Sequence, residues 1–553
     1  MQQIRDALAA ALQKEGVSDA AIPLEHTADF AHGDYASSAA LAFSKQLATN
    51  PRALAEKLVA SMGAVEGVSK IEIAGPGFIN FTLDPKFLFE MLDIGRTHGE
   101  KWGSGISLKG KKVMVEYTDP NPFKEFHIGH LMSNAIGESI SRLIQAAGAI
   151  VVRANYQGDI GLHVAKAMYV LLRDKTQHPT SSQIGQAYSE GASLYESDEA
   201  VKTEINSINK RLYARGPEDV PLIALYEEGR DECLKAFAKI YEDLGTKFDH
   251  FFFESETGPR GLKIVRAHPE VFIESEGAVV FPEEKSGLHT RVFITSNGIP
   301  TYEAKELGLA ELKQEKGEFD EFVYITASEQ NDYFKVVTKA IGTVFPALKD
   351  KIVHQSHGMM RFADGKMSSR KGNVITGVSL IEDLEDVIAA RIKETRSDNP
   401  WLITQMAVAA IKFQILKGAA GKDVIYDRDR ALSTDGDSGI YLQYAHARTH
   451  AILEKAKEAG VNAQFDADAP MSELARILLR FYDTVLHAQE ELEPHIVANY
   501  LISVAAAFNS WYAKEQILDG TPAAAHKVAL TDIARQTLKN GLWLLGISAP
   551  ERV

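Results

Sequence analysis

The first hundred residues combine two hydrophobic periods. An apolar set at helical spacing opens the chain: Ile4, Leu8, Ala11 and Leu12. Further on, residues 71–73 and 78–83 alternate apolar and polar side chains on either side of a Gly-Pro-Gly turn at 75–77. We therefore expect residues 1–100 to form a small α+β unit with a strand hairpin.

The pattern then changes to buried strands alternating with amphipathic helices. After a Gly-, Ser- and Lys-rich linker at 101–112, residues 113–117 and 150–156 are predicted strands, and a helix between them has one apolar face: Ile128, Leu131, Ala135, Ile136, Ile140, Leu143 and Ile144. Strands are predicted again at 321–325 and near 352–354. Strand–helix–strand repetition predicts an α/β fold with a doubly wound parallel sheet, whose ligands bind at the carboxyl ends of the strands.

Two further stretches complete the predicted organisation. Residues from about 175 to 290 are charged and read as helical, so they interrupt the nucleotide-binding fold as an insertion. From about 400 onward the periodicity is almost entirely helical. The predicted domains are therefore 1–100, a catalytic domain at 101–395, and an all-α domain at 396–553.

Composition narrows the class of protein. The chain has 553 residues, of which 45% are hydrophobic and 24% charged, as in ordinary globular proteins. Cys233 is the one cysteine, which excludes intramolecular disulfides and zinc sites built from several thiolates, and suits a reducing, cytoplasmic location. We see no signal peptide and no run long enough to cross a membrane. The net charge of −15 argues against a generic nucleic-acid binder but allows one local basic stripe.

The loop and helix start at residues 119–130 carry the first group of candidate catalytic residues. His127 and His130 are three apart and would project from one face of the helix, while Gly129 lets a ligand approach the first turn. Helix N-termini bind phosphate, so this segment predicts an ATP site that would stabilise charge on the α-phosphate. A metal site or simple capping by the two histidines are the alternatives.

A second group of candidate residues begins at Lys366, 239 residues after His127. The loop holds three cations within six residues, between Gly365 and Gly372, and its candidate ATP-binding residues are Lys366, Met367, Ser368 and Ser369. The Lys366 ammonium, the hydroxyls and the backbone N–H groups would bind the triphosphate, and the glycines would let the loop close. The alternative is a solvated basic loop.

Together these segments resemble the two ATP signatures of class I aminoacyl-tRNA synthetases, and the whole chain resembles arginyl-tRNA synthetase. The matching residues are those at 32–36, 75–80, 120–121, 124, 127–130, 153–156, 158–161, 439–448, 508–512, 544–547 and 550–552. The resemblance implies ATP-dependent activation of arginine to arginyl-adenylate and transfer to the terminal ribose of tRNA-Arg. It also implies activation that requires bound tRNA, and ATP used with Mg²⁺.

The resemblance also implies an arginine pocket: Glu116 and Asn121 at the α-amino end, and Tyr302, Glu306 and Gln330 at the side-chain end. A guanidinium has donors only, so it needs carboxylates or carbonyls. Family members usually have Asp where this chain has Glu306, so Glu303 is the alternative acid. Many members use a lysine at the place of Lys124 instead of a second signature, but this chain keeps both Lys124 and Lys366.

The resemblance implies contacts with tRNA at both ends of the chain. Tyr441 and Tyr444 would share a helix face near Arg448, where unpaired anticodon bases could stack. A tyrosine stripe that only packs helices together is the alternative. The N-terminal unit resembles the domain that contacts the tRNA elbow.

Three other functions compete with this prediction. A cysteinyl-type synthetase would need zinc-binding cysteines, a non-catalytic relative would tend to lose the signature residues, and a small nucleotidyltransferase would not need the helical domain. Because arginine is recognised through buried hydrogen-bonding groups, we expect no editing activity in the insertion. A monomer without metal ligands of its own is expected.

Overall fold

The computed structural model describes residues 2–282, 287–363, 376–392 and 399–553. Its first part is an α+β unit whose antiparallel sheet has the strand order β1-β2-β4-β3. Apolar residues of α1, among them Leu8 and Leu12, are buried in one cluster with Ile79 and Phe81 of β4, as predicted. The elements are α1 (Gln2–Lys14), β1 (Glu25–His26), η1 (Phe30–His32), β2 (Tyr35–Ser37), α2 (Ala39–Ser44), α3 (Pro51–Met62), β3 (Val68–Ala74) and β4 (Phe78–Leu83).

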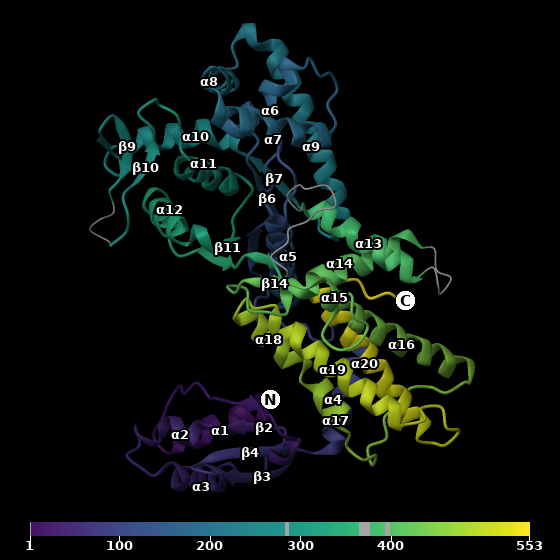
Figure 1. Cartoon of the computed structure of the whole chain (residues 1–553). Coiled ribbons are helices and arrows are strands. Elements are labelled where there is room, and N and C mark those ends of the chain that lie inside the picture. Colours follow the sequence, from purple (N-terminus) through teal and green to yellow (C-terminus); the bar gives the residue numbers. More distant parts are fainter. Residues whose placement is uncertain (1, 283–286, 364–375, 393–398) are drawn as a thin grey trace.

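The N-terminal unit docks onto the C-terminal helices α17 (Glu473–Leu479) and α18 (Phe481–Glu490) (Figure 1). The Asp34 carboxylate lies 3.3 Å from the Arg476 guanidinium. Asp483 accepts a hydrogen bond from the Tyr35 hydroxyl at 3.2 Å, and its carboxylate lies 2.9 Å from His26 Nε2. The residues at 32–36 that carry the family resemblance therefore include part of this interface.

A parallel five-stranded sheet forms the centre of the molecule, with the order β12-β11-β5-β6-β7. Val113 and Val115 of β5 point to the same cluster as Leu131 of α5, whereas Met114 joins a second cluster on the opposite face. The doubly wound fold is thus confirmed. The strands are β5 (Lys112–Glu116), β6 (Ile150–Gln157), β7 (His250–Phe253), β11 (Glu321–Ala327) and β12 (Ile352–His357).

Helices cover both faces of this sheet, and others extend beyond it. Those beside the sheet are α5 (Ile128–Ala146), α10 (Glu254–Ala267), α11 (Tyr302–Glu315) and α12 (Asn331–Val344), and α13 (Gly377–Ile392) packs against α5. Between β6 and β7 the chain adds α6 (Leu162–Arg173), α7 (Ser181–Ser197), α8 (Glu199–Ala214), η3 (Pro217–Asp219) and α9 (Val220–Asp243), which extend to the end of the molecule opposite the N-terminal unit (Figure 1).

The stretch at 175–290 is not purely helical. Its β7 pairs with β6 in the central sheet, and it also contributes two strands of a small antiparallel sheet in the order β10-β9-β8. The helical interruption of the fold therefore ends before residue 250. These strands are β8 (Ile273–Ser275), β9 (Ala278–Phe281) and β10 (Arg291–Ile294).

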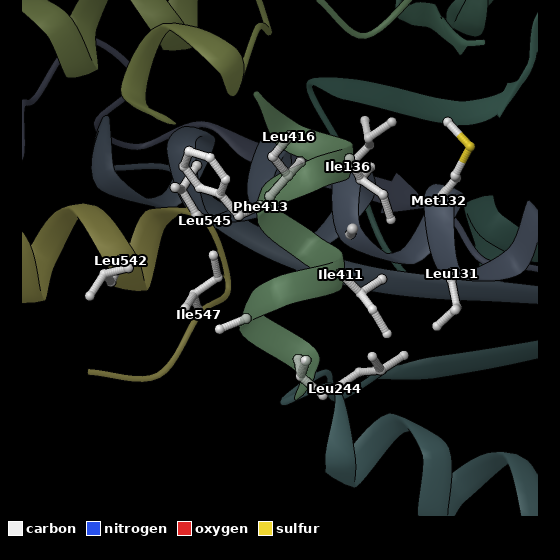
Figure 2. Close-up of a cluster of buried hydrophobic side chains, with 14 of the residues drawn as sticks. Leu131, Met132, Ile136, Leu244, Ile411, Phe413, Leu416, Leu542, Leu545 and Ile547 are labelled. Carbon is white, nitrogen blue, oxygen red and sulfur yellow. The ribbon is translucent and has the colours of Figure 1, made fainter. Parts of the chain in front are cut away.

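The C-terminal part is helical, as predicted, and it shares a core with α5. Figure 2 shows Ile411 of α14 on the side of the helix where Ile136 of α5 lies, and Phe413 on the opposite side, next to Leu545. α4 packs against α17 and α20. Besides α17 and α18, the elements of this part are α14 (Pro400–Leu416), β14 (Val424–Tyr426), α15 (Arg428–Ala431), α16 (Gly439–Glu458), α19 (His495–Lys514) and α20 (Ala524–Leu544). Further elements from earlier in the chain are α4 (Pro85–His98), η2 (Gly99–Lys101), η6 (Pro346–Leu348) and β13 (Met360–Phe362).

None of the helices described in the structure is both apolar and long enough to cross a bilayer.

Candidate active site

The two histidines of the first signature form a stacked pair at the start of α5. Their ring centroids are 3.5 Å apart, with an interplanar angle of 21°. His127 is the N-cap: its Nδ1 accepts from the Gly129 amide at 3.1 Å, and its own amide donates to His130 Nδ1 at 3.2 Å. Because both Nδ1 atoms accept, the neutral form of each ring carries its proton on Nε2.

Both rings stay neutral near neutral pH. Burial, followed by the charges of His127 and Lys124, lowers the pKa of His130 well below its ordinary value. The pKa of His127 is lowered by burial and then by Lys124. The pair therefore offers two N–H donors without net charge, next to the positive end of the α5 dipole.

The second signature lies outside the described residues: Lys366, Met367, Ser368 and Ser369. The described segment that follows it returns directly to the first signature. Thr376 forms a β-bridge with His127, and the Gly377 amide donates to the Phe126 carbonyl at 2.6 Å. The chain after the second signature therefore leads straight to the histidine pair.

The loop that leads into α5 is held by Phe123. Its ring is fully buried and stacks on Tyr226 with a centroid distance of 5.9 Å, and its amide donates to Cys233 Sγ at 3.3 Å. Lys124, the next residue, is half-buried, with its ammonium 5.3 Å from the centre of the Tyr188 ring. Burial lowers the pKa of Lys124, and the Glu254 carboxylate opposes that shift. Cys233 therefore has a structural contact with the loop that leads into α5.

Two carboxylates predicted for arginine are buried and electrostatically coupled. Glu116 ends β5 with 4% exposure, and its Oε2 lies 2.8 Å from the ammonium of Lys313. Glu306, on α11, is 8% exposed, and its Oε2 has no hydrogen-bond partner among the residues that the structure describes. Burial, and then the charge of Glu116, raises the pKa of Glu306 to about 8. Lys313 thus pairs with Glu116, while one oxygen of Glu306 is available to a ligand.

The alternative acid, Glu303, is already paired. Its Oε1 accepts from Arg291 of β10 at 3.2 Å. Glu306 is thus the better candidate of the two for a bound guanidinium, because its oxygen remains available.

The other residues predicted for arginine lie at the ends of neighbouring elements. Tyr302 begins α11 and is 63% exposed, and Gln330 is exposed in η5 (Ser328–Gln330), just after β11. Asn121 is half-buried against Gly158, where an added Cβ would lie 2.2 Å from Asn121 Oδ1. β5, β6 and β11 are adjacent strands, so Glu116, Asn121 and Gln330 all follow the carboxyl edge of one part of the sheet.

Sequence reasoning missed two charged residues of this region. Lys313 lies seven residues after Glu306, and that helical spacing was a usable sign that the two share a face of α11. Asp119 has φ +44°, and burial followed by the Glu116 charge raises its pKa well above the ordinary value. Long-range packing places Asp119 there, so the sequence alone gave no comparable indication.

The predicted anticodon face is only partly exposed. Tyr441 and Tyr444 of α16 are half-buried, and Arg448 is exposed. Asn509 of α19 links two of them, because its amide donates to the Tyr441 hydroxyl at 2.9 Å and its oxygen accepts from Arg448. His446 of the same helix is buried and bonds to the Pro550 carbonyl at 2.9 Å, so it packs the chain end.

Among the residues that the structure describes, no group of three or more His, Cys, Asp or Glu side chains could hold a metal ion.

Comparison with known proteins covers almost the whole chain. The family described as "tRNA synthetases class I (R), catalytic domain" matches residues 98–427, "DALR anticodon binding domain" matches 442–553, and "Arginyl tRNA synthetase N terminal domain" matches 2–83. The arginine–tRNA ligase of Clostridium perfringens is 32% identical over 88% of each chain. That of Borrelia hermsii is 29% identical over 91% of this chain and 90% of its own.

A solved structure, that of the Thermus thermophilus arginyl-tRNA synthetase, superimposes with a TM-score of 0.84 at 25% identity, covering 100% of both chains. The catalytic family spans more than half of the sequence, and the relatives match it in length. The parallel sheet that follows the N-terminal unit, the histidine pair at the start of α5 and the helical C-terminal part agree with these matches. This chain belongs to the arginine–tRNA ligases of class I.

Proposed function

We propose that the chain activates L-arginine with ATP and transfers it to tRNA-Arg. In the first step a carboxylate oxygen of arginine attacks the α-phosphorus of ATP, and pyrophosphate leaves as arginyl-adenylate forms. In the second, a hydroxyl of the terminal adenosine attacks the arginyl carbonyl, and AMP leaves. The observation that carries the proposal is the neutral, stacked pair His127–His130, whose Nε2–H groups and helix end suit a developing phosphate charge.

The proposed ATP site combines this pair with lysines from two loops. His127, Gly129 and His130 would hold the α-phosphate, and Lys124 would reach the phosphates from the preceding loop. The second signature would close over the triphosphate: Lys366, Met367, Ser368 and Ser369. Mg²⁺ would arrive with ATP, held mainly by phosphate oxygens and water, so it needs no cage of protein ligands.

The proposed arginine pocket uses charge of the opposite sign. Glu116 and Asn121 would receive the α-amino group, and Glu306 would receive the guanidinium between Tyr302 and Gln330. Lys313 neutralises Glu116, so the negative charge that meets a cationic amino acid comes from Glu306, which ionises when arginine binds.

Recognition of tRNA would involve both ends of the chain. Tyr441, Tyr444 and Arg448 would meet anticodon bases, and the N-terminal unit would contact the elbow. We expect activation to depend on bound tRNA, the segment at 175–290 to lack editing activity, and the protein to act as a cytoplasmic monomer without zinc.

Pyrophosphate exchange with arginine, measured with and without tRNA-Arg, tests the proposal. Exchange should require arginine and rise strongly when tRNA-Arg is added. His130→Ala should lower kcat by the equivalent of about 2.7–4 kcal/mol, because it removes one transition-state donor. His178→Ala, which changes an exposed histidine on the helical extension, is the matched control and should leave kcat unchanged.

Absence of arginine-dependent exchange under both conditions would contradict the proposed reaction. Equal exchange with and without tRNA would contradict only the tRNA requirement.

A further inference from the structure

Two helix ends from distant parts of the chain face each other across a pair of cations. Arg142 of α5 donates to the Gly245 carbonyl at 2.9 Å and to the Trp543 carbonyl at 2.8 Å. Lys412 of α14 donates to the Leu244 carbonyl at 2.6 Å and to the Gly546 carbonyl at 2.8 Å. Each cation therefore bridges the end of α9 to the end of α20. We name Arg142, Lys412 and these four carbonyls the cation brace.

The placement of the brace is electrostatically favourable but costly in solvation. The last carbonyls of a helix are unsatisfied and carry the negative end of its dipole, so a cation between two such ends is well placed. Lys412 is nevertheless only 1% exposed, and its neighbours Ile411 and Phe413 pack in an apolar core (Figure 2). Apolar replacements of buried charges often preserve or increase stability, so a basic group here, which burial leaves only partly charged near neutral pH, points to a need for defined geometry.

A chain of contacts leads from the brace toward the arginine pocket. Arg142 Nε donates to Glu138 at 2.7 Å, Arg153 donates to the same carboxylate at 3.0 Å, and the Tyr117 hydroxyl also donates to it. The Tyr117 ring lies directly on Gly137 of α5, where an added Cβ would be 2.3 Å from Tyr117 Cγ. Tyr117 is the residue after Glu116, so its position constrains that carboxylate.

The next two residues are in a conformation that their surroundings must enforce. Thr118 has φ +79° and Asp119 φ +44°, both in the left-handed region that a β-branched residue rarely adopts. The Thr118 amide donates to Ser133 Oγ of α5 at 2.8 Å, and Asp119 accepts from the Tyr156 amide at 2.7 Å. α5 therefore holds Tyr117 and the backbone of Thr118, and β6 holds Asp119.

We propose that Arg142 and Lys412 are positioning residues of the charging reaction, which set the geometry of the arginine pocket according to how α20 is seated. The inference rests on the proposed function, because it assigns arginine to the pocket beside Glu116. α20 lies in the anticodon-binding part of the chain, and α5 and α9 lie in the catalytic part. Binding of tRNA to the C-terminal helices could thus alter the pocket through this contact.

The test compares Arg142→Gln and Lys412→Met with the wild-type chain in tRNA charging. Both variants should raise the KM for arginine about tenfold while the KM for ATP changes less than twofold, because Arg142 bonds to the carboxylate that holds Tyr117 beside Glu116, whereas the histidine pair lies at the other end of α5. Arg142→Lys, which keeps the charge but has a shorter reach and one nitrogen, should give a smaller rise.

Val504→Ala is the matched control for a loss of stability alone. Val504 is fully buried in α19, so the variant should lower the melting temperature without a selective change in the KM for arginine. Arg142→Gln carries the test if Lys412→Met does not fold, because the Arg142 side chain is partly exposed. An arginine KM within twofold of wild type in the folded brace variants, or an equal rise in Val504→Ala, would overturn the inference. A wild-type chain that does not charge tRNA would instead overturn the proposed function.

Discussion

Binding of arginine should release a proton from Glu306. This carboxyl is buried, and burial and the nearby Glu116 raise its pKa to about 8, against the opposing charge of Lys313. A guanidinium binds the ionised form, so the bound state favours a deprotonated Glu306. The binding of arginine is therefore coupled to the release of a proton from Glu306.

The size of this release follows from the raised pKa. A group whose pKa lies one unit above the pH is about nine-tenths protonated, so at about pH 7 each bound arginine should release roughly 0.9 proton. Below about pH 8 the Kd for arginine should fall about tenfold per pH unit as pH rises. Above that value it should become nearly constant, because Glu306 is already ionised in the free protein.

Isothermal titration calorimetry of arginine binding in phosphate and in Tris buffer measures the proton release directly. Glu306→Gln should bind arginine weakly and release almost no proton. Glu303→Gln is the matched control, because Glu303 is paired with Arg291, and it should retain the release. An undiminished release in Glu306→Gln would refute the reasoning and would identify Asp119, whose pKa is also raised, as the source.

Three other predictions concern stability and tRNA affinity. Burial lowers the pKa of Lys412 to about 7, so above that pH the unfolded chain keeps a proton on Lys412 that the folded chain has lost. The free energy of unfolding should therefore rise by up to about 1.4 kcal/mol per pH unit toward pH 10. Urea titrations at two pH values should show this rise in the wild-type chain and not in Lys412→Met. In Gly261→Ala the added Cβ would lie 1.8 Å from the Ala304 carbonyl and displace α11. The variant should therefore have a lower melting temperature and weaker arginine binding, both of which calorimetry measures. Asp483→Ala removes the partner of His26, so charging kinetics should show a KM for tRNA raised about tenfold, or ~1.4 kcal/mol, with the KM for ATP unchanged.

Local patterns predicted the parts of the fold whose cause is local. The alternation at 78–83 and the apolar face of the helix at 128–144 became β4 and the buried side of α5, because each period matches one regular structure. The signature at 127–130 was predicted at a helix start, and His127 is indeed the N-cap. Dipeptide turns and cap positions depend on a few neighbouring residues, so the sequence contains that information.

Long-range pairing could not be predicted in the same way. β7 is a short strand next to a long helical stretch, and only its pairing with β6 shows that it belongs to the sheet. The ion pair of Glu116 with Lys313 depends on how α11 packs across two strands. His446 lies on α16 two residues after Tyr444, yet the chain end that covers it comes more than a hundred residues later.

The site must bind a polyanion and a cation next to each other, and the pKa shifts show how the two are kept compatible. A protonated His130 would attract ATP but would repel the positive charges of arginine at the ends of the adjacent strands. Burial keeps this ring neutral, so ATP would be met by N–H donors and a helix dipole, and Glu306, which ionises when arginine binds, would be the charge that holds the amino acid. Selectivity for a cationic amino acid thus requires the phosphate site beside it to act without histidinium.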